Sequence, residues 1–132
     1  MKKFILIVMV ILFFTVPAIS ADITLAWDPN SEEDLVGYKI YYKINSSGSP
    51  YNGRNATQGD SGISVTLEEF DNSQEPLFTL TGLSDDTLYY LAVTAYNDSA
   101  ESGYSNEVNY LTPPAPVLPP PSPNSLEDIT DD

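Results

Sequence analysis

The residues of this chain that could do chemistry are carboxylates and hydroxyls, with few cations beside them. Its 132 residues include 19 Asp and Glu, 5 Lys and Arg, no histidine and no cysteine, and the formal net charge is -14. Without histidine or cysteine there is no Cys/His zinc site, no thiol nucleophile and no Ser-His-Asp triad. Glu68 and Glu69 are adjacent, so in a strand they would point to opposite faces and could not serve one substrate as an acid and base pair. We therefore predict that the chain is not an enzyme.

One acidic segment has the alternating oxygen donors of a possible calcium loop. Its donors are Asp28, Asn30, Glu32 and Asp34. The EF-hand pattern requires glycine at the sixth position and glutamate at the twelfth, where this sequence has Glu33 and Lys39. Turn propensity accounts for the segment instead, so we predict a solvated acidic loop that holds no metal and no cofactor.

Tyrosine and arginine are the residue types here that are most able to bind a partner. Tyr51 and Arg54 lie in a long segment without periodicity, and loop aromatics and arginines are enriched at recognition surfaces. Tyr41 alternates with residues expected to point inward, so it is expected to be exposed, as are Tyr90 and Tyr104. We take Tyr41, Tyr51 and Arg54 as candidate ligand contacts, although packing within the loop would also explain the last two. Nucleic acid is not an expected partner, because so acidic a chain has few cations to displace counterions from phosphates.

Residues 1–21 have the pattern of a secretory signal peptide. Two lysines precede an apolar run over residues 4–16, and a proline and small residues follow it up to Ala21. The run is shorter than the roughly 20 residues that a membrane span needs, so we expect cleavage after Ser20 or Ala21 and no membrane insertion afterwards. The expected location is secreted, periplasmic or at the cell surface.

From residue 22 to residue 112 the apolar residues recur with the period of two that is typical of β-strands. The six predicted strands span residues 22–27, 36–44, 63–67, 77–81, 87–96 and 106–112. In the second strand, Lys39, Tyr41 and Lys43 share one face, on which both lysines are expected to point to solvent. A long loop over residues 45–62 follows it. With no helical segment among them, these strands predict an all-β antiparallel sandwich or small barrel.

The last 20 residues, 113–132, change composition abruptly. Seven of the 11 prolines lie in residues 113–123, which favours extended polyproline II structure and a stiff spacer. The final segment, NSLEDITDD, is acidic and has little to bury, so we predict disorder there. The chain is therefore divided into a signal peptide (1–21), one domain (22–112), and a proline-rich linker with an acidic disordered tail (113–132).

A tryptophan in the first strand and the segment LTGLSDDTLYYLAVTAYN carry a family pattern. Trp27 is followed by Leu83 and, six residues later, by Tyr89, whose hydroxyl in this pattern bonds back across the corner between two strands. Residues 22–112 thereby resemble a fibronectin type III domain, and ITLAWDPN, DLVGYKIYY and ESGYSNEVNYLT resemble segments of its secreted bacterial members. The resemblance implies an immunoglobulin-like antiparallel β-sandwich of six to seven strands. The expected core residues are Trp27, Tyr38, Ile40, Tyr42, Leu83, Tyr89, Leu91 and Val93.

Most members of that family have one more strand before the strand that holds the tryptophan. Cleavage of residues 1–21 would leave too few residues ahead of Trp27, so this first edge strand is expected to be missing and one sheet edge to be open. An open edge can pair with a strand of a partner, or with the segment around Val117 and Leu118.

The resemblance also implies a function. It indicates a non-catalytic exported binding or spacer module that contacts protein or polysaccharide at the cell surface or in the periplasm. Two alternatives stay open: an accessory module associated with a polysaccharide-degrading enzyme, or a subunit of an extracellular assembly joined through the open sheet edge. The sequence names neither the ligand nor the oligomeric state.

Overall fold

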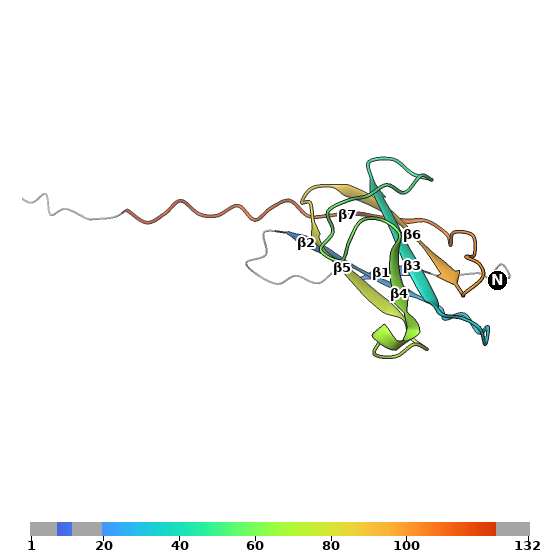
Figure 1. The fold of residues 1–132 in the computed structure, drawn as a ribbon. Helices are drawn as coiled ribbons and strands as arrows, with labels where there is room; N and C mark the ends of the chain where they lie inside the picture. Colours follow the sequence, from blue (N-terminus) through green and yellow to red (C-terminus); the bar gives the residue numbers. More distant parts are fainter. Residues whose placement is uncertain (1–7, 12–19, 124–132) are drawn as a thin grey trace, which may run out of the picture.

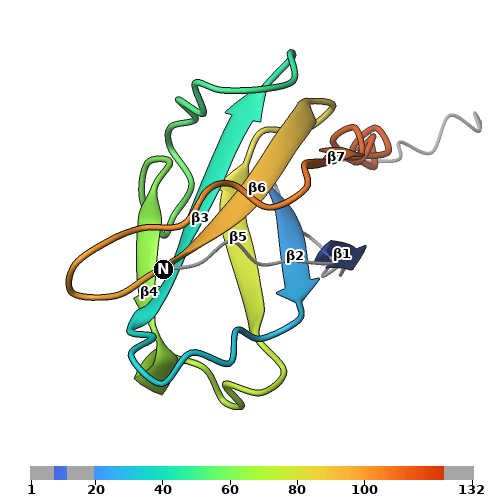
Figure 2. The same cartoon turned by 90° about the vertical axis from the view of Figure 1, so that its right-hand side faces the viewer.

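Two antiparallel β-sheets packed face to face form the fold (Figure 1). The computed structural model describes residues 8–11 and 20–123. One sheet has the order β1–β2–β5 and the other the order β4–β3–β6–β7, and Figure 2 shows them as two layers. The strands are β1 (Val8–Ile11), β2 (Ala21–Trp27), β3 (Gly37–Ile44), β4 (Ile63–Thr66), β5 (Leu77–Leu83), β6 (Leu88–Tyr96) and β7 (Val108–Leu111). The alternation predicted an all-β antiparallel sandwich or small barrel and the family resemblance implied a sandwich, and the sandwich is confirmed.

The core lies between the sheets and is built from the side chains that face inward from both. Trp27 packs edge-on against Tyr38, with 5.1 Å between ring centroids, and against Phe70, at 5.8 Å. Tyr38 is fully buried, and its hydroxyl oxygen accepts a hydrogen bond from the Asn30 N–H at 2.8 Å. The side chains expected in the core are all buried: Trp27, Tyr38, Ile40, Tyr42, Leu83, Tyr89, Leu91 and Val93.

A short helical turn replaces the end of the third predicted strand. β4 ends at Thr66, and a 3-10 turn, η1 (Leu67–Glu69), follows it. The Glu69 carboxylate accepts a hydrogen bond from the Thr66 N–H at 2.7 Å, which stabilises this turn over continued strand. The prediction that this strand continues through Leu67 is therefore wrong by one residue. In the part of the chain that the structure describes, no helix is long and apolar enough to cross a membrane.

In the full-length chain, the sheet edge that was expected to be open carries a strand. β1 pairs antiparallel with β2, from Val8 opposite Trp27 to Ile11 opposite Thr24, and it also lies beside β7. The segment is a continuous apolar run rich in valine and isoleucine, which is compatible with a strand. The expectation of a missing edge strand is thus corrected for the full-length chain, and it applies only to a chain that has lost residues 1–21.

The long loop over residues 45–62 is held against the sandwich by the side chain and backbone of Tyr42. The Tyr42 hydroxyl accepts a hydrogen bond from the Ala56 N–H at 3.1 Å and donates one to the Gly59 carbonyl at 2.7 Å. Gly53 donates its N–H to the Tyr42 carbonyl at 2.8 Å. The loop then reaches β5, where the Thr57 N–H donates to the Thr81 carbonyl at 2.8 Å. It therefore has a defined path, although its sequence shows no periodicity.

The corner between β5 and β6 contains the tyrosine expected from the family pattern. Tyr89 is buried, and its hydroxyl accepts a hydrogen bond from the Ser84 N–H at 2.9 Å. This bond ties the turn after β5 to the start of β6.

Replacing Tyr89 by phenylalanine is expected to lower the free energy of unfolding by about 1 kcal/mol, because the part-buried Ser84 N–H would lose its acceptor. Urea denaturation of both proteins measures this difference. Tyr90→Phe is the matched control, since the adjacent Tyr90 faces the other way along β6, and its stability should equal that of the wild type. Equal stability of Tyr89→Phe and the control would contradict the role of the corner hydrogen bond.

A buried threonine ends the last strand pairing. The Thr112 hydroxyl donates a hydrogen bond to the Ser84 carbonyl at 2.7 Å and accepts one from the Thr87 N–H at 2.9 Å. Pro113 and Pro114 follow, and they have no N–H with which to extend the ladder. Residues 113–123 then lead away from the sandwich (Figure 1) and are mostly exposed. The segment predicted to be disordered, NSLEDITDD, lies outside the described residues.

Candidate functional site

Three tyrosines from distant segments meet on the outer face of the four-stranded sheet. Tyr41 belongs to β3, Tyr51 to the long loop over residues 45–62, and Tyr104 to the loop between β6 and β7. The ring centroid of Tyr104 lies 5.0 Å from that of Tyr41 and 4.9 Å from that of Tyr51. The ring centroids of Tyr41 and Tyr51 are 6.3 Å apart. Tyr104 is 49% exposed, while the other two are half-buried. We call these three residues the tyrosine cluster.

Two carboxylates accept hydrogen bonds from the hydroxyl groups of Tyr41 and Tyr51. Glu101 accepts hydrogen bonds from the Tyr41 hydroxyl at 2.5 Å and the Thr94 hydroxyl at 2.8 Å. Glu107 accepts one from the Tyr51 hydroxyl at 2.5 Å. Both glutamates lie in the connection between β6 and β7, so this connection holds the cluster together. The rim of the cluster is consequently acidic.

The surroundings of Tyr41 and Tyr51 keep these two tyrosines neutral, and those of Glu101 keep its carboxylate charged. Burial, followed by the hydrogen bonds to Glu101 and Glu107, raises the pKa values of Tyr41 and Tyr51 above their ordinary value. Burial by itself would raise the pKa of Glu101, but hydrogen bonds from Tyr41, Thr94 and Lys39 outweigh it and lower that pKa. None of these three groups therefore changes its protonation state near neutral pH, as a general acid or base would need to do. The arrangement is suited to contact rather than to proton transfer.

The two lysines of β3 have different surroundings, although both lie on the outer face of the sheet. Lys39 makes an ion pair with Glu101 at 3.2 Å and lies 5.5 Å from the centre of the Tyr96 ring. Lys43 is only 8% exposed, and it donates a hydrogen bond to the Gly48 carbonyl at 2.8 Å. The prediction that Lys43 points to solvent is thus wrong, because the long loop folds back over it.

The structure brings together two of the three predicted ligand contacts and places the third beside them. Tyr41 and Tyr51 share the tyrosine cluster. Arg54 is exposed and lines a shallow pocket of about 170 Å³ together with Tyr51 and Asp60. Tyr104 was expected to be exposed but was not among the predicted contacts. Its place beside Tyr51 depends on the course of two loops, which no sequence pattern indicates.

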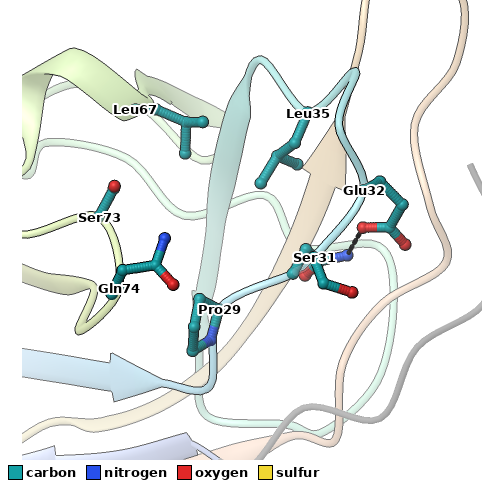
Figure 3. A pocket seen from close by; sticks show the side chains of 8 residues that line it. Pro29, Ser31, Glu32, Leu35, Leu67, Ser73 and Gln74 are labelled. Atoms are coloured by element: carbon teal, nitrogen blue, oxygen red, sulfur yellow. Dashed lines mark hydrogen bonds between the residues drawn. The ribbon is translucent and has the colours of Figure 1, made fainter.

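A second hollow lies at the opposite end of β3, next to the acidic segment (Figure 3). It has a volume of about 320 Å³, and its lining includes Pro29, Leu35 and Leu67. Glu32 accepts a hydrogen bond from the Asn30 side chain at 2.9 Å, as drawn in Figure 3. Within residues 8–11 and 20–123, no three acidic side chains lie close enough to hold a metal ion. Glu32 is instead engaged with the neighbouring Asn30 side chain.

The two antiparallel sheets and the tyrosine corner define an immunoglobulin-like β-sandwich. The family model of the fibronectin type III domain matches residues 14–110, and the chain belongs to this family. Domains of this family are typically non-catalytic binding or spacer modules.

Solved structures with a similar fold include the FN1–FN3 domains of chicken CNTN1. The TM-score is 0.59 and the identity 20%, over 81% of this chain and 29% of that chain. The third fibronectin III domain of the human KIAA0343 protein gives a TM-score of 0.49 and 24% identity, over 77% of each chain. This chain thus spans less than a third of the CNTN1 chain, and the likeness concerns the fold alone. No curated protein matches the chain.

Proposed function

We propose that this chain is an exported, non-catalytic module that binds a protein partner at the cell surface or in the periplasm through the tyrosine cluster. The gathering of Tyr41, Tyr51 and Tyr104 on one sheet face carries the proposal. Tyrosine is enriched among the residues that dominate binding energy at protein interfaces, because it offers a large rigid apolar surface with a polar end. The signal-like pattern of residues 1–21 supports export.

The mutual angles of the three rings favour a protein partner over a polysaccharide. The ring of Tyr104 is inclined by 85° to that of Tyr41 and by 67° to that of Tyr51, and the other pair is inclined by 55°. The rings therefore do not form the coplanar platform on which a flat polysaccharide surface would stack. They form instead an uneven apolar patch with an acidic rim, which suits the side chains of a protein surface.

The test is cosedimentation of the purified exported protein with envelope fragments of the producing cells. Saturable binding is expected, and prior protease treatment of the fragments should abolish it. Tyr104→Ala should weaken the binding at least about tenfold, which is the scale of an interface residue that contributes more than 1.4 kcal/mol. Tyr104 is half exposed, so this variant should retain the far-UV circular dichroism of the wild type.

Tyr90→Ala is the matched control, because Tyr90 of β6 lies on the same outer face of the four-stranded sheet as the tyrosine cluster but does not belong to the cluster. It should bind like the wild type. If binding survived protease treatment, or if the protein also bound insoluble cellulose or chitin, the partner would be a polysaccharide and the proposal of a protein partner would be wrong. If Tyr104→Ala and the control bound equally well, the tyrosine cluster would not be the binding site. If the protein bound neither envelope fragments nor polysaccharide, the proposal would be refuted and the domain would be a spacer.

A further inference from the structure

The outer edge of β2 is built to accept an antiparallel strand. In the full-length chain β1 occupies it, in a register that runs from Val8 opposite Trp27 to Ile11 opposite Thr24. An edge strand presents a row of backbone N–H and C=O groups, and β1 pairs those of β2. The strand that does so lies entirely within the segment predicted to be removed on export.

Cleavage at the predicted place would leave this edge without a strand. β2 begins at Ala21, so cleavage after Ser20 makes the first residue of β2 the new N-terminus. No upstream residue would then remain to pair with β2. The strand that would then form the edge carries Ile23 and Leu25, whose side chains are fully buried in the core.

The features that usually prevent edge pairing are confined to the first two residues of β2. Its sequence, ADITLAW, contains no proline and no lysine, and Asp22 is its one charged residue. The register shift against β5 is confined to the Ala21 end, so the ladder is regular from Ile23 onward. The opposite edge of the same sheet, formed by β5, is contacted by the long loop, because Gln58 and Thr57 make hydrogen bonds with the backbone of Thr81.

The proline-rich tail is a poor strand to pair with this edge. Val117 and Leu118 are 96% and 79% exposed and do not pair with the sandwich. Prolines at positions 116 and 119 flank them, so the segment offers only two consecutive N–H groups to a ladder. A longer strand without proline is needed.

We propose that the exported chain dimerises by antiparallel pairing of β2 with the β2 of a second copy, centred on Thr24. In this register Asp22 lies opposite Ala26 of the other copy, so the two carboxylates do not face each other. Ile23 lies opposite Leu25 on the inner face, so the two cores become neighbours across the joined sheet. The pairing obeys a two-fold axis, as a closed dimer requires.

The experiment expresses the full chain in an exporting host and purifies the processed protein, with its N-terminus established by mass spectrometry. Sedimentation equilibrium should show a monomer–dimer equilibrium for the processed wild type. Ala26→Glu places a carboxylate opposite Asp22 of the other copy and should weaken the dimer at least tenfold. Ala26→Lys places an ammonium there and should leave the dimer at least as tight.

A double variant and a separate binding assay complete the test. Asp22→Lys combined with Ala26→Glu reverses the charges across the interface and should restore the dimer. If Ala26→Glu and Ala26→Lys weakened the dimer equally, the proposed register would be wrong. If the processed wild type were monomeric, or if the exported chain kept residues 1–21, the dimer itself would be ruled out. Ala26→Glu should cosediment with envelope fragments as the wild type does, so failure of this inference is distinct from failure of the proposed function.

Discussion

Replacing Trp27 by alanine is expected to lower the free energy of unfolding by about 3 to 5 kcal/mol, the range observed when a large aromatic side chain is removed from a core. Trp27 is 5% exposed and lies edge-on against Tyr38 and Phe70 at the end of β2. Its removal leaves a cavity lined by the ring of Tyr38, which is fixed on β3, and by the ring of Phe70, which directly follows η1, so the surroundings can collapse only in part. Because domains of this size are stable by about 5 to 15 kcal/mol, the variant should be close to unfolding.

Urea denaturation followed by far-UV circular dichroism measures this loss. Fluorescence of the chain's one tryptophan is unsuitable, because the variant lacks it. Trp27→Phe is the matched control, since it keeps a ring for the edge-on contacts and should cost less than half as much as the alanine variant. If the alanine variant lost no more stability than the phenylalanine variant, the ring contacts of Trp27 would not matter to the core.

Replacing Gly37 by alanine is expected to cost about 3 kcal/mol or more, or to prevent folding. Gly37 is the first residue of β3, where it lies between Thr66 of β4 and Tyr96 of β6. A Cβ atom at this position would overlap the Val65 carbonyl oxygen and lie 2.9 Å from the Thr66 Cα. Both obstacles are backbone atoms of a paired strand, so relief requires β4 to move away and lose hydrogen bonds.

Gly103→Ala is the matched control for this substitution. An added Cβ at Gly103 meets no atom within 4 Å, and the backbone there does not have a positive φ. The control should stay within about 0.5 kcal/mol of the wild type in the same urea titration. Equal stability of the two variants would mean that β4 does not approach β3 as closely as the structure shows.

Strand positions could be predicted from the sequence because alternation is a local property. Along β3, one set of residues meets the core and the other faces outward, as the period of two requires. Where the pattern failed, a local competitor or a distant segment decided the outcome. Glu69 stabilises a turn where Leu67 would have continued a strand, and the long loop covers Lys43.

The candidate site was predictable only in part, because its members meet through loops. Tyr41 was identified as outward-facing from its strand, but its neighbours Tyr51 and Tyr104 come from two loops with no periodicity. Glu107 determines where Tyr51 lies, and nothing near either residue in the sequence indicates the pair. β1 was missed for another reason: a continuous apolar run is compatible with a signal peptide and with a strand, and composition does not separate them.

The hydrogen bonds of Thr112 to the β5–β6 corner affect how mechanical load would enter the domain. A pull on the C-terminal tail would first load the Pro113 carbonyl, which accepts a hydrogen bond from the Asp86 N–H at 3.0 Å. It would next load the buried Thr112 hydroxyl, which is hydrogen-bonded to Ser84 and Thr87, and only then the β6–β7 ladder. The Ser84 N–H also donates to the Tyr89 hydroxyl, so the Thr112 hydrogen bonds and the tyrosine corner share one turn and would resist tension together. The sandwich thus has a reinforced attachment point at the place where the predicted proline-rich spacer begins.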